Sequence, residues 1–210
     1  MEITRRDMGR LALAGLSAAQ TLPAKPNSMF GGVQVGINIP YSYHGLPSNA
    51  DQILDYMNQT GVSAAELRTQ PIEAALGAPA IASRGVGSGA RMRNGKPEEL
   101  SADVKAQLDE LQKWRLSRSM NEFKQFRKKY EDAGVKIEIV KMDGINTAPD
   151  DVLDYCFQMA KALGAYAISC EIPVSQTKRL GAFAAKHKFM VGYHGHGNLT
   201  NPEAFGRLGA

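Results

Sequence analysis

The sequence predicts an α/β fold with a parallel sheet, built as a partial (β/α)8 barrel of about five β/α units. Strand-like segments alternate with helix-like segments at a spacing of roughly thirty residues, which is typical of βαβ units. Each strand carries one apolar face and one small or polar face, whereas strands covered by helices on both sides are apolar throughout. A closed barrel needs eight strands and typically about 250 residues, so this 210-residue chain predicts a fragment of a barrel. The alternative is an open five-stranded sheet.

Residues 1–24 predict an export leader rather than part of the fold. Arg5 and Arg6 precede a short apolar run, residues 11–19, and small residues follow it. This order is typical of secretory leaders, and paired arginines are typical of the twin-arginine type. We therefore expect an exported or periplasmic protein with no stable membrane span, because the run is too short for one. The alternative is a disordered basic start with a stray helix.

The main domain is predicted over residues 33–210, after a linker at residues 25–32. Its strands are expected at residues 33–39, 63–69, 136–142 and 165–172, and from residue 188 onward. Its helices are expected at residues 49–60, 97–114, 119–132, 149–163 and 176–187. Val33, Val35, Ile37 and Ile39 are expected to form the apolar face of the first strand. Ser119 and Glu122 have the spacing of a capping box.

An insertion is predicted at about residues 77–118, as a loop followed by a helix. The loop is rich in glycine, serine and arginine and includes the stretch Gly85–Gly89. Such a stretch can cradle a phosphate, but here it lacks the Lys-Ser/Thr that follows in phosphate-binding loops. We therefore expect a mobile inserted loop.

Acid/base and metal-ligating groups are predicted at the carboxyl ends of the last two strands. His194 and His196 are two residues apart, so both lie on one face of the last strand. Glu171 ends the small, polar face of the preceding strand, after Ala167 and Ser169. The carboxyl ends of parallel strands form one edge of the sheet, where parallel α/β folds carry their chemistry. A carboxylate with an imidazole suits Zn, Mn, Co or Fe, so we expect a divalent metal there.

Glu171 and His194 are therefore the candidates for catalysis and for metal ligation. The candidates for substrate contacts are His196, Glu66, His44 and Lys141. Alternatives remain for each role. Glu171 is equally suited to pairing with an arginine or lysine, and Glu66 to a buried pair with Arg68 or Lys141. His44 suits an exposed loop, and the side that Lys141 faces depends on the strand register.

The composition argues against several classes of protein. A net charge of +4 is too small to predict nucleic-acid binding by itself, and two cysteines cannot form a disulfide scaffold. The basic residues of the helix at 119–132 suit a solvated face better than a nucleic-acid contact. We therefore expect a small-molecule ligand and no nucleic acid. Free strand edges also make an oligomer an expected outcome.

Several segments together resemble one known family. They are residues 35–37, 65–69, 113–117, 160–165, 171–173 and 191–196, including Glu171-Ile172-Pro173 and Val191-Gly192-Tyr193-His194-Gly195-His196. In this order they resemble the sugar phosphate isomerase/epimerase family, with its xylose isomerase-like TIM barrel of the AP endonuclease 2-like superfamily. The resemblance spans residues 33 to about 203. A twin-arginine leader is similar to that of exported bacterial members.

The resemblance implies a divalent metal at the mouth of the barrel and isomerisation or epimerisation of a sugar by proton transfer next to a carbonyl. It also implies further metal ligands on later strands, before which this sequence ends, so that the chain looks truncated at its C-terminus. Two alternatives stay open. One is a non-catalytic or vestigial sugar-binding fragment, and the other is a phosphodiesterase similar to endonuclease IV.

Overall fold

The computed structural model describes residues 25–81, 92–93, 96–97, 99–195, 200 and 202–205. The predicted leader, the glycine-rich part of the insertion and His196 lie outside these residues.

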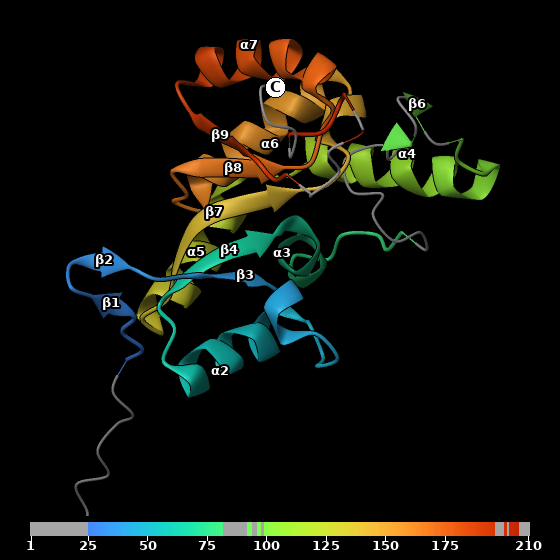
Figure 1. Ribbon diagram of the computed structural model, residues 1–210. Coiled ribbons are helices and arrows are strands. Elements are labelled where there is room, and N and C mark those ends of the chain that lie inside the picture. Colours follow the sequence, from blue (N-terminus) through green and yellow to red (C-terminus); the bar gives the residue numbers. More distant parts are fainter. Residues whose placement is uncertain are drawn as a thin grey trace, which may run out of the picture.

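A five-stranded parallel sheet forms the centre of the described structure, and its strands follow one another in chain order (Figure 1). The strands are β3 (Ile37–Ile39), β4 (Ala64–Arg68), β7 (Lys136–Met142), β8 (Ala167–Cys170) and β9 (Met190–Tyr193). Each new strand adds to the same edge of the sheet, so right-handed crossovers place the connecting helices on one face. The predicted α/β fold with a parallel sheet is confirmed.

Six helices connect or precede these strands in the described residues. They are α2 (Ala50–Thr60), α3 (Thr69–Ala75), α4 (Ala102–Leu116), α5 (Met120–Asp132), α6 (Asp150–Ala162) and α7 (Thr177–His187). The capping box predicted at Ser119 and Glu122 is present at the start of α5. Gly61 ends α2 in the left-handed conformation, with a φ of 73°. No described helix combines the length and the apolar character needed to cross a bilayer.

Short elements complete the described structure. They are the strands β1 (Met29–Phe30), β2 (Val33–Gln34), β5 (Met92–Arg93) and β6 (Lys96–Pro97) and the 3-10 helices η1 (Tyr41–Tyr43), η2 (Ile145–Thr147) and η3 (Val174–Gln176).

The hydrophobic core lies between the helices and one face of the sheet. Leu67, Val140 and Ile168 are register partners on β4, β7 and β8, and all three have no exposed surface. They pack in one cluster with buried side chains of α2, α5 and α6. Since successive residues of a strand point to opposite sides, their neighbours Glu66, Lys141 and Ser169 face the other side of the sheet.

The first predicted strand is wrong in part. Residues 33–39 do not form one strand, because β2 pairs with β1 in a hairpin and β3 begins only at Ile37. Ser28, in the predicted linker, donates its hydroxyl to the carbonyl of Val35 at 2.6 Å and its N–H to Ser63. These bonds hold the segment before β3 in a turn. Val33 and Val35 are consequently exposed rather than part of the apolar face.

Candidate active site at the carboxyl edge of the sheet

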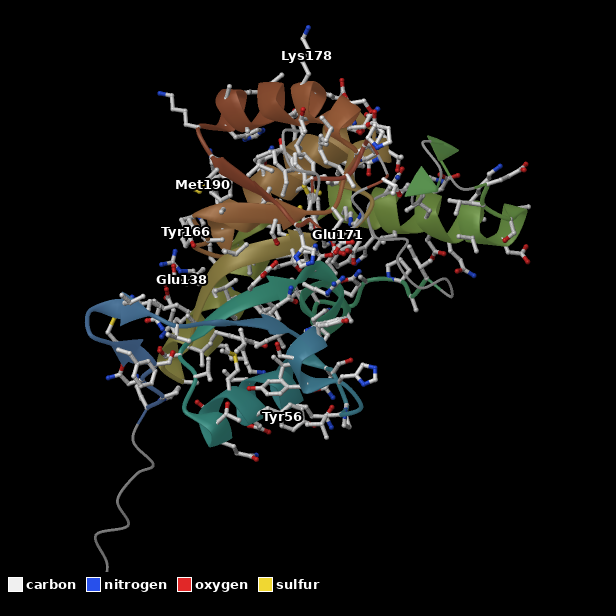
Figure 2. All side chains as sticks on the ribbon, in the orientation of Figure 1. Tyr56, Glu138, Tyr166, Glu171, Lys178 and Met190 are labelled. Atoms are coloured by element: carbon white, nitrogen blue, oxygen red, sulfur yellow. The ribbon has the colours of Figure 1, made fainter. Side chains whose placement is uncertain are left out.

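Two rows of residues across the sheet position the candidate groups. In the first row, Arg68, Lys141, Ser169 and Gly192 are register partners on β4, β7, β8 and β9. One residue further on, Met142, Cys170 and Tyr193 are partners on the helix-covered side. The next residues along the chain are Asp143, Glu171 and His194. These three therefore stand side by side at the ends of consecutive strands, as Figure 2 shows for Glu171.

Each cation of the first row binds a carboxylate beyond the end of the next strand. Nζ of Lys141 lies 2.8 Å from Oε1 of Glu171, and Nη1 of Arg68 lies 2.7 Å from Oδ2 of Asp143. Lys141 is fully buried, whereas the side chain of Glu171 is 41% exposed. The pair thus joins a buried ammonium to a carboxylate that solvent or a ligand can reach. The alternative that Glu171 pairs with a lysine or arginine is confirmed.

Glu66 lies one row closer to the amino ends of the strands. Its carboxylate accepts a short hydrogen bond from the hydroxyl of Ser169, and within the described structure it forms no ion pair with Arg68 or Lys141. The alternative that Glu66 forms a buried pair with one of those cations is therefore wrong, because both cations bind acids at the strand ends. Glu66 remains half-buried on the polar face of the sheet.

The histidines are placed differently from one another. The N–H of His194 donates to the carbonyl of Cys170 at 2.9 Å, which continues the pairing of β9 with β8 and holds His194 beside Glu171. The side chain of His194 is exposed. His44 is also exposed, in the turn after η1, and no described hydrogen bond joins its side chain to the other candidates. The prediction for His196 lies outside the described residues.

Cys170 lies behind this edge, on the core side of β8. Burial raises the pKa of its thiol to about 12, and the neighbouring Lys141 offsets this only in part. A thiol with such a pKa carries almost no thiolate at neutral pH, so Cys170 is unsuited to nucleophilic attack. Its part in the site is to fill the core beneath Glu171.

The described residues do not complete a metal site. They contain no group of three or more His, Cys, Asp or Glu side chains able to hold a metal ion. Glu171 is already bound by Lys141, and Asp143 accepts hydrogen bonds from Arg68 and Gln70. Positive side chains thus occupy the carboxylates that a divalent cation needs. The metal at Glu171 and His194 therefore remains a prediction, and no chemical step below depends on it.

Sequence reasoning missed Asp143 as a member of this edge. The signal was available, because Asp143 directly follows the strand predicted at residues 136–142. It also did not identify the hydrogen bond between Ser169 and Glu66, since that contact joins strands far apart in the sequence.

Comparison with known proteins gives little further information. No protein-family model and no curated protein matches the chain. A crystal structure of an uncharacterized protein from Parabacteroides distasonis is similar at 19% sequence identity and a TM-score of 0.46. The alignment covers 78% of this chain and 53% of that one, so the chain spans about half the length of this neighbour. A similarity at this level assigns no function.

Proposed function

We propose that the chain is a sugar isomerase or epimerase that transfers a proton next to a carbonyl, with its site at the carboxyl edge of the sheet. The observation that carries the proposal is the pair of the buried Lys141 with the accessible carboxylate of Glu171, beside His194. Proton abstraction next to a carbonyl needs a base at the carbon and a positive or hydrogen-bonding group at the oxygen. A carboxylate, an imidazole and an ammonium in one place supply these groups.

Each side chain has a role that follows from its exposure. Glu171 is the base, because 41% of its side chain is exposed. His194 is exposed beside it and is the group that donates a hydrogen bond or a proton to the substrate oxygen. Lys141 has no exposed surface and therefore acts through Glu171, by holding its carboxylate in one orientation. It is a positioning residue in this scheme.

We also propose that the sheet is part of a (β/α)8 barrel of the xylose isomerase type. The chain order of the strands and the helices on a single face support this proposal. In such a barrel the polar face of the sheet is the interior, and the carboxyl ends of the strands form the mouth. Export through the twin-arginine route and a divalent metal at the mouth stay part of this proposal as expectations.

The test is hydrogen exchange at the substrate carbon, because it detects the first step whatever the product. The purified protein is incubated in D2O with aldoses and ketoses, free and phosphorylated, each with and without added Mn²⁺, Co²⁺ or Zn²⁺. NMR then follows loss of the C–H signal next to the carbonyl. We expect exchange with at least one sugar, and a rate about 10²- to 10⁴-fold lower for Glu171→Gln.

The matched control is Glu131→Gln, which removes an exposed carboxylate on α5 and should leave the rate unchanged. Absence of exchange with every sugar would refute catalysis by this chain. Sugar binding without exchange would instead favour the non-catalytic alternative. No described contact favours a phosphodiesterase, since three of the four basic residues of α5, namely Arg127, Lys128 and Lys129, are paired with acids.

A further inference from the structure

A pocket lies on the polar face of the sheet, toward the end opposite to Glu171. It has a volume of about 290 Å³ and is lined by residues of β3, β4 and β7 with neighbouring segments. Its polar lining comprises Gln34, Asn38, Glu66, Glu138 and Tyr166. Figure 2 shows Glu138 and Tyr166 at the amino ends of their strands, with Glu171 at the other ends.

A β-bulge turns Glu138 into this pocket. Ala65 pairs with Ile137 and Glu66 pairs with Ile139, so Glu138 is the extra residue of β7 and has no partner on β4. Bulges redirect side chains in this way. Ile139 and Glu138 both line the pocket, together with Glu66 of β4.

The described lining of the pocket offers acceptors and no positive side chain. None of the described residues that line it is a lysine, arginine or histidine. The side-chain oxygen of Asn38 is buried and has no hydrogen-bond partner among the described residues, which is unusual for a buried polar atom. The side-chain amide nitrogen of Gln34 already donates to Ser28, Val35 and Ser63, so its N–H groups are not available to a ligand in the pocket. Two carboxylates therefore line the pocket with no positive side chain among the described residues, and that of Glu66 also accepts from the Ser169 hydroxyl.

We propose that this pocket binds a small organic cation, namely a protonated primary amine. An ammonium group brings a positive charge and three donors, which match the carboxylates of Glu66 and Glu138. Tyr166 is 53% exposed, and its ring is available for contact with the cation or with its carbon skeleton. The same charges disfavour a phosphate or carboxylate ligand. This inference does not rest on the proposed isomerase activity, because the pocket and the Glu171 edge are at different ends of the sheet face.

Two matched pairs of ligands test the proposal. They also distinguish an amino sugar from an aliphatic amine as the ligand. D-glucosamine is compared with N-acetyl-D-glucosamine, and 1,4-diaminobutane with 1,4-butanediol. Binding is measured at pH 7 by calorimetry and located by NMR shifts of the backbone amides of Gly36, Ala65 and Ile139. We expect the charged member of at least one pair to bind at least tenfold more tightly than its neutral partner. Preference in the first pair identifies an amino sugar, and preference in the second an aliphatic amine.

Substitutions of Glu138 and Tyr166 then test whether these side chains of the pocket bind the amine. Glu138→Gln should weaken binding of the amine about five- to tenfold and leave the neutral partner unaffected. Tyr166→Phe should retain binding, whereas Tyr166→Ala should weaken it. Glu131→Gln is the matched control on α5 and should have no effect, and circular dichroism checks that each variant is folded. Equal affinity for both members of each pair, shifts outside the pocket, or full affinity of Glu138→Gln would each overturn the proposal.

Discussion

The Nζ atom of Lys141 lies 2.8 Å from Oε1 of Glu171, and the two side chains differ sharply in exposure. Lys141 is a register partner of Ser169 on β8, so the carboxylate that it binds lies two residues further along that strand. The ammonium is fully buried, and 41% of the Glu171 side chain is open. Lys141 is thereby held within the folded chain, whereas Glu171 is accessible from outside.

Lys141→Met should lower the rate of proton exchange by about 10- to 100-fold with little change in KM. The expected cause is a misplaced Glu171 carboxylate, since small displacements of a catalytic group cost rates of this size. Lys141→Arg keeps the charge and should restore part of the rate. The measurement is kcat and KM for the variants beside Lys186→Met, which removes a surface ion pair with Asp154. An unchanged kcat for Lys141→Met would remove Lys141 from the mechanism.

A divalent metal that binds the carboxylate of Glu171 must compete with the ammonium of Lys141, which already binds it. If the metal predicted at Glu171 and His194 binds, Lys141→Met should raise the affinity for Mn²⁺ about tenfold or more, because it removes a charge that repels the cation. Calorimetric titration of the wild-type protein, of Lys141→Met and of Lys141→Met with His194→Ala measures this. Failure of Mn²⁺, Co²⁺ and Zn²⁺ to bind any of these proteins would contradict the predicted metal.

Breaking the buried pair of Arg115 and Glu73 should strongly destabilise the protein. Nε and Nη2 of Arg115 each donate to a carboxylate oxygen of Glu73 at 2.7 Å, and Tyr155 donates to the same carboxylate at 3.0 Å. All three side chains are almost fully buried. Arg115→Met leaves the Glu73 charge without its cation and should cost about 3–5 kcal/mol of unfolding free energy.

The double variant Arg115→Met with Glu73→Met separates the charge from the packing. It should recover much of the lost free energy, because it leaves no unpaired buried charge. Urea denaturation measures both proteins, with Lys128→Met as the control, since it breaks an exposed pair with Asp132. A double variant as unstable as Arg115→Met would show that the apolar pair does not fit the space between α3 and α4.

The two cysteines should resist alkylation in the folded protein. Cys156 and Cys170 are free and buried, and burial raises the pKa of Cys170 to about 12. At pH 8 only about one Cys170 thiol in ten thousand is then ionised. Mass spectrometry after iodoacetamide treatment should show no labelling at pH 8 and two labels in urea. Rapid labelling of Cys170 in the native protein would contradict the packing of β8.

Acid should weaken the attachment of α7. Hydrogen bonds from Lys186 and then His187 lower the pKa of Asp154 below its ordinary value. A carboxyl group whose pKa is lowered by folding stabilises the protein above its unfolded pKa, and this contribution is lost as pH falls through the folded pKa. Asp154→Asn should therefore lower the urea midpoint at pH 7 and have a smaller effect at about pH 3. An equal effect at both pH values would argue against this linkage.

Much of the sheet could be predicted from the sequence, because the alternation of polar and apolar side chains is a local property of each strand. The polar face of Ala167, Ser169 and Glu171 and the apolar positions Ile168 and Cys170 follow from a period of two residues. The structure has Ile168 and Cys170 in the core and an accessible carboxylate at Glu171. The first strand was harder, since Ser28 bonds to Val35 and Ser63 across the predicted linker and breaks the pattern.

Alternation in the sequence shows which side chains share a face of β8 and β9, and hence that Glu171 and His194 end polar faces. The contacts between strands were needed to show that Lys141 binds Glu171, that Arg68 binds Asp143, and that Glu138 lines a pocket. The physical reason is that alternation depends on the backbone of one strand. Register and bulges depend instead on how two strands pack against a common core. The strands β4 and β7, for example, are about seventy residues apart in the sequence.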